Sequence, residues 1–191
     1  MLERLLQWDR NTFIYLNSLG IEKYDAFWAT VTNTTTWIPL FLLFLYLFIR
    51  NFPRKEALLG IFTVALLVLI TTLATDLTKE WVARLRPNNE PQINMFIRIL
   101  KSPTGYSFFS GHASSSFSVT TLVVFILRQR ISWIWLCYIW PLLYSFSRIY
   151  VGVHYPVDIL VGALVGTTMA WIFYRIYIRT IVPGSGSGRP V

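Results

Sequence analysis

Side chains that can act in catalysis or bind an anion are concentrated in residues 147–158, where an arginine, a histidine and a carboxylate interrupt a mostly apolar chain. Pro156 is suited to the first turn of a helix, so His154 is predicted just before a helix start and Asp158 within its first turn. The carboxylate can then hold one ring nitrogen of His154 and leave the other as a nucleophile or base. Arg148 can present its planar guanidinium to an anion beside that nitrogen.

Two other segments carry groups of a similar kind. Lys79 and Arg86 lie seven residues apart at the end of an apolar run, and this spacing predicts that both cations point from one helix face. Ser110, Gly111 and His112 precede another apolar run. A hydroxyl and free backbone N–H groups at a helix N-terminus are an arrangement that receives phosphate.

Each of these residues, taken alone, also fits a structural role. His154 and Asp158 can be a helix-start pair, and Arg148 can cap the end of the preceding helix. Ser110 can be an N-cap and His112 an interfacial histidine. The chemical interpretation therefore depends on whether the fold brings the three segments together.

The composition is that of a membrane protein. Of 191 residues, 54% are hydrophobic and only 14% are charged. The net charge of +8 does not indicate a nucleic-acid partner, because the basic residues lie at the ends of apolar segments. The lone Cys137 can form no internal disulfide, and charges near the N-terminus argue against a cleavable signal peptide.

The predicted fold class is all-α, a polytopic membrane helix bundle of about five transmembrane helices. We expect an interfacial amphipathic helix over residues 1–25 and a transmembrane catalytic domain over residues 26–180. The Gly-Ser-rich residues 183–191 resemble a flexible expression remnant and are left out of the fold prediction. The predicted spans are residues 27–49, 57–78, a segment that follows His112 and reaches residue 127, then 131–146 and 157–178.

Three local patterns add detail to this bundle. The polar residues 32–36 inside the first span must face protein or water. Residues 88–106 form a polar loop long enough to be a lid or a substrate-contacting segment. Gly162, Gly166 and Ala170 recur every four residues, which predicts a close-packing face within the chain rather than a dimer seam.

Five spans place all three polar segments at one membrane face. The short turns at the opposite face are rich in arginine, so by the positive-inside rule that face is cytoplasmic. We therefore expect a multi-pass plasma-membrane protein whose site and N-terminal helix lie on the outer, periplasmic or extracellular, side.

Together the segments resemble the motifs of the type 2 phosphatidic acid phosphatase (PAP2) family, which shares its site with bacterial acid phosphatases and vanadium haloperoxidases. A Lys, six residues and Arg-Pro match residues 79–87, and the Ser-Arg, His and Asp motif matches residues 147–158. The Ser-Gly-His of the remaining motif is present at 110–112, but Phe109 stands where the family has proline. The resemblance covers roughly residues 57–178.

The resemblance implies a lipid phosphatase that forms a phosphohistidine. His154 would attack phosphorus, Asp158 would orient it, and His112 would protonate the leaving group and then activate water. Fixed cations take the place of a metal, so we expect no metal and no cofactor. The implied phosphate-binding residues are Lys79, Arg86, Ser110, Gly111 and Arg148.

The expected partners are the bilayer and a membrane lipid phosphate; no oligomeric state is predicted. Candidate substrates are undecaprenyl diphosphate, phosphatidylglycerol phosphate, phosphatidic acid and lipid A phosphates, and an outward-facing site favours a cell-envelope lipid. We expect sideways entry past aromatic residues such as Trp81, Phe108 and Phe109. Three alternatives stay open: a lipid phosphotransferase using the same histidine, a vanadium-haloperoxidase-like enzyme, and a non-catalytic lipid-phosphate binder.

Overall fold

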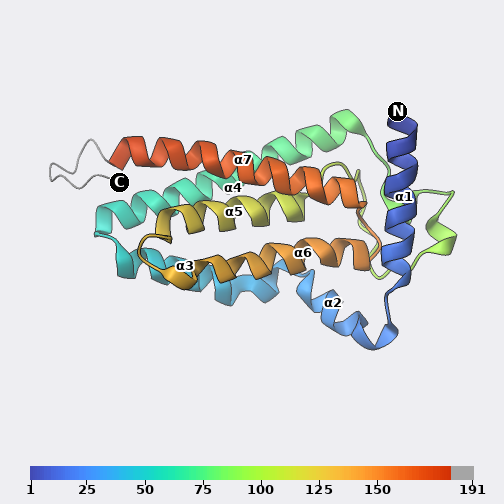
Figure 1. Ribbon diagram of the computed structural model, residues 1–191, viewed down its shortest axis with the longest axis horizontal. Helices are drawn as coiled ribbons and strands as arrows, with labels where there is room; N and C mark the ends of the chain where they lie inside the picture. Colours follow the sequence, from blue (N-terminus) through green and yellow to red (C-terminus); the bar gives the residue numbers. More distant parts are fainter. Residues whose placement is uncertain (182–191) are drawn as a thin grey trace.

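The computed structural model describes residues 1–181, which are mainly helical and include no strand. This confirms the all-α prediction; the predicted tail, residues 183–191, lies outside the described residues. The helices run side by side, and α1 lies across one end of the bundle (Figure 1). The α-helices are α1 (Leu2–Ser18), α2 (Asp25–Val31), α3 (Ile38–Asn51), α4 (Arg54–Val82), α5 (Gly111–Leu127), α6 (Ile139–Tyr150) and α7 (Pro156–Ile181). Short 3-10 helices are η1 (Glu22–Tyr24), η2 (Thr34–Trp37), η3 (Pro87–Asn89), η4 (Asn94–Phe96) and η5 (Ser132–Tyr138).

Within residues 1–181, three helical segments are long and apolar enough to cross a membrane: Thr34–Asn51, Arg54–Asn89 and Pro156–Thr180. The shorter apolar helix α5 packs against α4, α6 and α7, and most of its side chains are buried. Ser115, Ser116 and Thr121 of this helix therefore form hydrogen bonds within the protein instead of meeting lipid.

The first predicted span is not one continuous helix, as was expected for residues 27–49. Helix α2 ends at Val31, and α3 begins only at Ile38 after the turn of η2. The Asn33 side chain accepts a hydrogen bond from the Thr35 N–H, a local bond that competes with helix formation. The polar residues 32–36 thus break the span, and Thr32 is buried against protein.

Helix α4 extends beyond the second predicted span, residues 57–78, at both ends. The position of its C-terminal end contradicts one prediction. Helix α4 ends at Val82, and Ala83 adopts a left-handed conformation with φ 50°. Arg86 is extended (φ −74°, ψ 153°), as expected for a residue that precedes proline. The prediction that Lys79 and Arg86 share one helix face is therefore wrong, because the helix stops between them.

The fourth predicted span, residues 131–146, is also different in the structure. It starts as the 3-10 helix η5 and continues as α6, which ends at Tyr150. Pro141 lies in the first turn of α6, where its missing N–H leaves no helical bond unmade. As a result, Ser147 and Arg148 lie in the last turns of a helix and not in a loop.

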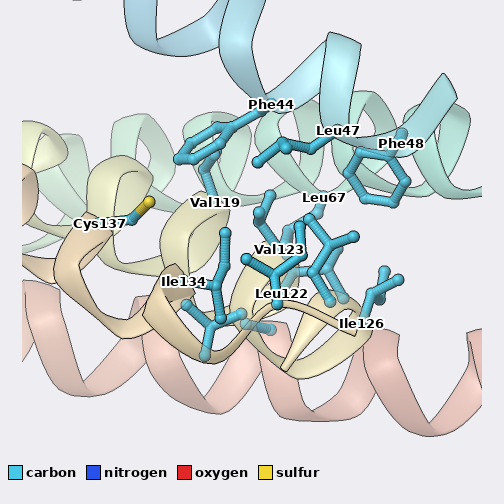
Figure 2. Close-up of a cluster of buried hydrophobic side chains, with 14 of the residues drawn as sticks. Phe44, Leu47, Phe48, Leu67, Val119, Leu122, Val123, Ile126, Ile134 and Cys137 are labelled. Carbon is cyan, nitrogen blue, oxygen red and sulfur yellow. The ribbon is translucent and has the colours of Figure 1, made fainter. Parts of the chain in front are cut away.

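The main hydrophobic core joins helices α3 to α7 and η5. Figure 2 shows Phe44, Leu47 and Phe48 of α3 pointing toward the side chains of α5, including Val119 and Leu122. This core fills the space between helices α3 to α7, and through Tyr144 it reaches the end that carries the polar residues.

Helices α5 and α7 pack at close range through glycine. A Cβ atom on Gly166 would overlap with the Ser114 carbonyl oxygen, and one on Gly162 would lie 2.7 Å from the Ser110 carbonyl oxygen. The predicted close-packing face within the chain is therefore confirmed. The same contact brings the start of α5 to the start of α7, where the Ser110 N–H donates to the Asp158 carbonyl oxygen at 2.9 Å.

We expect Gly166→Ala to destabilise the protein by about 1–3 kcal/mol, because the added methyl group must displace the backbone of α5. Thermal unfolding in detergent measures the effect as a lower Tm. The control is Thr168→Ala, at an exposed position of the same helix, which should leave the Tm unchanged. A Gly166→Ala protein as stable as the control would show that the two helices are not in such close contact.

Candidate active site

The three polar segments meet at the end of the bundle where α1 lies. Helices α5 and α7 begin there, and α4 and α6 end there (Figure 1). The prediction that all three segments lie at one end of the bundle is therefore confirmed.

His154 and Asp158 form a buried pair. The Nδ1 atom of His154 lies 3.3 Å from Oδ2 of Asp158, and the same oxygen accepts a bond from the Tyr155 N–H at 3.0 Å. Because the carboxylate accepts a hydrogen bond from Nδ1–H, the Nε2 atom keeps a lone pair. Burial lowers the pKa of His154 to about 4, so the imidazole is neutral near pH 7.

Two arginines lie buried near this pair without a counter-charge. Arg86 is 7% exposed and Arg148 is 6% exposed, and neither forms a salt bridge with any residue of 1–181. The Nε–H groups of both have no hydrogen-bond partner in this part of the chain. Arg86 Nη1 lies 3.1 Å from His154 Nε2, so a guanidinium without a salt bridge lies beside the ring nitrogen that does not face Asp158.

Buried charges are costly unless they are paired, and a buried donor without an acceptor adds to that cost. Proteins keep such arrangements where a ligand supplies the missing charge. The pair of buried arginines therefore makes this end of the bundle a preformed receptor for an anion.

Arg148 is held by the break in the first span. Its Nη1 donates to Thr32 Oγ1 at 2.6 Å. Close by, the His112 ring stacks on Tyr144 with 4.5 Å between centroids, and the Tyr144 hydroxyl bonds Thr34 Oγ1 at 2.7 Å. Residues 32–34 thus support the arginine directly and the second histidine through Tyr144.

His112 and Arg148 face a common cleft of about 480 Å³. Its other lining residues come from two segments, the helix break at Thr32, Asn33 and Thr34 and the loop at Lys101, Ser102 and Pro103. The cleft gives an anion a way to reach the buried arginine.

Ser110, Gly111 and Lys79 lie at the start of α5. The Ser110 side chain is buried and accepts a bond from the Ala113 N–H at 3.4 Å, so it is the N-cap of the helix. A Cβ atom on Gly111 would lie 3.6 Å from Lys79 Nζ, which places the lysine beside this helix start. Lys79 also contacts the exposed Asp76, at 3.3 Å.

Residues 57–181 match the family model of the PAP2 superfamily. The chain belongs to the PAP2 superfamily. The matched range includes all the residues described for this site except Thr32, Asn33 and Thr34 of the helix break.

Known PAP2 proteins resemble the chain over most of its length. It is 30% identical to a lipid A 4'-phosphatase of Bacteroides thetaiotaomicron over 98% of this chain and 88% of that protein. It is 33% identical to an undecaprenyl-diphosphatase of Sulfolobus acidocaldarius over 73% of this chain and 63% of that one. The crystal structure of a transmembrane PAP2 phosphatidylglycerolphosphate phosphatase from Bacillus subtilis has the same fold, with a TM-score of 0.72 and 19% identity over 93% of this chain and 88% of that one. As a member of the PAP2 superfamily with phosphatase relatives, this chain is a membrane phosphatase.

Several residues of the PAP2 site were not predicted from the sequence. Thr32 and Tyr144 support charged or aromatic groups of the site, and Lys101 lines the cleft. The threonine-rich stretch was a usable signal, because it was expected to face protein or water. Arg84 and Asp9 were also missed, although Arg84 lies inside the matched residues 79–87.

The aromatic residues expected at a lipid entrance are not grouped as predicted. Trp81 is 86% exposed, whereas Phe109 is buried. The apolar pocket of about 370 Å³ between α3, α4, α5 and α6 is lined by none of the three aromatic residues Trp81, Phe108 and Phe109. Thr34 lines both this pocket and the polar cleft, so the two cavities adjoin at the helix break.

Residues 1–181 contain no group of three or more His, Cys, Asp or Glu side chains placed to hold a metal ion. The groups gathered at the site are cations and histidines instead, which suit a phosphate and not a metal.

We expect inorganic phosphate to raise the Tm of the purified protein, because it supplies the charge that the buried arginines lack. Arg86→Gln should weaken phosphate binding roughly 10-fold or more, the effect of losing hydrogen bonds to a charged group. Without phosphate this variant should be at least as stable as the wild type, since it removes an unpaired buried charge.

The matched control is Arg50→Gln, an exposed arginine at the far end of the bundle, which should keep the full phosphate-dependent rise in Tm. An equal rise in the Arg86 and Arg50 variants would exclude Arg86 from the anion site.

Proposed function

We propose that this PAP2 protein hydrolyses a phosphorylated membrane lipid through a phosphohistidine on His154, and that it needs no metal. The observation that carries the proposal is the pair of buried, unneutralised arginines beside the Nε2 atom of a histidine whose other nitrogen faces a carboxylate. Such a site binds a phosphate and holds a nucleophile against it.

In the first step His154 Nε2 attacks phosphorus, and the bond from phosphorus to the lipid oxygen breaks. His112 donates a proton to the departing oxygen. In the second step His112 takes a proton from water, the water oxygen bonds phosphorus as the Nε2–P bond breaks, and inorganic phosphate leaves. The imidazole becomes positively charged when the Nε2–P bond forms, and Asp158 stabilises that charge.

The phosphate oxygens are bound by fixed donors. Arg86 and Arg148 offer buried guanidinium groups, and Lys79 lies beside Gly111 at the start of α5, where backbone N–H groups are free of helical bonds. As the N-cap, Ser110 uses a lone pair of its oxygen, and the hydroxyl hydrogen remains available to a phosphate oxygen. These charges act on the transition state in the way that magnesium acts in many phosphoryl-transfer enzymes.

The substrate is a lipid of the cell envelope. The lipid A 4'-phosphatase relative favours a phosphorylated glycolipid, and the undecaprenyl-diphosphatase relative makes a polyprenyl diphosphate the second candidate. The adjoining polar and apolar cavities suit a molecule with a phosphate head and a hydrocarbon tail.

The site lies on the outer face of the plasma membrane. Arginines at the opposite end of the bundle, including Arg50 and Arg130, support a cytoplasmic position for that end. We retain residues 26–180 as the catalytic domain and residues 1–25 as the interfacial helix. Trp8 and Tyr15 of this helix are exposed, as suits a water–lipid boundary.

Phosphate release from detergent-solubilised lipid phosphates tests the activity. We expect the wild type to release inorganic phosphate in EDTA, and His154→Ala to lose at least about 1,000-fold in kcat while keeping its Tm. Arg50→Gln serves as the active control. Dependence on a divalent ion, or near-normal turnover by His154→Ala, would contradict the mechanism. Transfer of the phosphoryl group to a second lipid would identify a phosphotransferase, and binding without turnover would identify a binder.

Lys101 gives a separate prediction about the lipid head group. It lines the cleft with His112 and Arg148 and has no salt-bridge partner among residues 1–181. We expect Lys101→Gln to raise KM several-fold with kcat nearly unchanged, because the lysine contacts a part of the substrate away from the reacting bond. Lys55→Gln, in the basic turn at the far end, is the control. A fall in kcat with KM unchanged would place Lys101 at the reacting phosphate instead.

A further inference from the structure

Helix α1 delivers a buried carboxylate to the back of the catalytic pair. Asp9 is fully buried, and its Oδ2 accepts from Arg84 Nη2 at 2.7 Å. The other terminal nitrogen of Arg84 donates to Asp158 Oδ1 at 2.8 Å. Asp9, Arg84 and Asp158 thus form a continuous chain that ends at His154. The family match begins at residue 57, so Asp9 lies outside it.

Arg84 is held rigidly at the centre of this chain. Its guanidinium carbon lies 3.9 Å from the centre of the Tyr155 ring, and its two terminal nitrogens bond different carboxylates. The side chain is only 17% exposed. The left-handed turn at Ala83 ends α4 just before Arg84, which frees the arginine from the helix and lets it reach both partners.

Asp9 also fixes α7 itself. Its Oδ1 accepts a hydrogen bond from the Val157 N–H at 2.9 Å, one of the N–H groups that have no partner within a helix. Burial raises the pKa of Asp9, and the bonds from Val157 and Arg84 oppose this rise only in part. Both bonds are made to the ionised carboxylate and favour that form.

The rest of α1 keeps Asp9 in register. The Phe13 ring packs edge-on against Tyr155, with 5.4 Å between centroids. The buried Asn17 amide donates to the carbonyl oxygens of Ile149 and Tyr150, and its oxygen accepts from the Arg98 N–H at 2.7 Å. Helix α1 is thus joined by specific polar bonds to the segments that carry the site.

The charges of this chain favour the attack by His154. Paired with Arg84 alone, Asp158 would be neutralised and would hold a developing imidazolium weakly. Asp9 supplies a second negative charge, so the three side chains together carry a net charge of −1. Asp158 can then both orient the imidazole and stabilise the positive charge that forms on it.

We propose that Asp9 and Arg84 are positioning residues of the His154–Asp158 pair, and that α1 is therefore a working part of the active site. The inference rests on the proposed function, which it deepens. Asp9 and Arg84 act through Asp158 and do not touch the substrate.

Asp9→Asn tests the inference with little change in shape. We expect kcat to fall about 10- to 100-fold, as when the outer partner of a functional histidine is lost, with KM within about twofold. The phosphate-dependent rise in Tm should remain, because Arg86 and Arg148 are untouched. Glu3→Gln removes the same charge from an exposed position of the same helix and should behave as wild type.

A double-mutant cycle tests whether the two residues act as one unit. Asp9→Asn combined with Arg84→Gln should lose no more kcat than Arg84→Gln alone. Two fully additive losses would show that Asp9 does not act through Arg84 and would overturn the proposal. A kcat of Asp9→Asn within twofold of wild type would also overturn the proposal. A joint loss of kcat and phosphate binding in Asp9→Asn would overturn it as well, because it would indicate a structural role.

A second measurement does not depend on turnover. The chain has only two histidines, so ¹⁵N-histidine NMR can follow the His154 tautomer directly. We expect Asp9→Asn to raise the fraction of His154 with its proton on Nε2, and Glu3→Gln to leave this fraction unchanged. An unchanged tautomer in Asp9→Asn overturns the proposal. A wild type that releases phosphate from no lipid would overturn the proposed function alone, and the tautomer would still decide the role of Asp9.

Discussion

The structure depends on holding uncompensated positive charge inside the end of an apolar helix bundle. Arg86 and Arg148 are buried without a carboxylate partner among the described residues. Two such groups destabilise the protein unless other contacts hold them in place. The surrounding structure supplies these contacts as neutral acceptors, the Val153 carbonyl for Arg86 and the Thr32 hydroxyl for Arg148. Their positive charge therefore remains available for a phosphate.

Asp158 connects this receptor to the packing of the helices. Its side chain accepts bonds from His154, Tyr155 and Arg84, and its carbonyl oxygen accepts from the Ser110 N–H. The last contact is possible because glycines let α7 approach α5 closely. Helix packing and the geometry of His154 are thus set by the same residue, which explains why the polar groups gather where α5 and α7 begin.

The N-terminal part of the chain completes the site although it lies outside the family match. The broken first span supplies Thr32 and Thr34, and α1 supplies Asp9. A continuous helix over residues 27–49 would have left Arg148 without the Thr32 hydroxyl. The break therefore has a function in this protein, because it supplies the hydroxyl that holds Arg148. Irregular backbone at membrane depth is tolerated where it is buried in protein or lines a cavity.

The sequence by itself determined the helical class, the end of the bundle that carries the site, and the identity of most of its charged residues. It could do so because hydrophobic length, helix-start signals and motif spacing are local properties of the chain. Gly162 and Gly166 were also correctly assigned to close packing within the chain, a prediction that depends only on their spacing. The direct roles of the site residues in catalysis stay predictions.

Only the tertiary structure decided how the backbone breaks and which distant residues meet. The left-handed turn at Ala83 lets Arg84 reach Asp9 and Asp158. The interruption after Val31 likewise brings Thr32 to Arg148, and local propensity does not reveal which distant residues such breaks bring into contact. Asp9 and Arg84 are separated by 75 residues. Their ion pair with Asp158 exists because α1 crosses the end of the bundle, and no spacing within one segment records a contact of that kind.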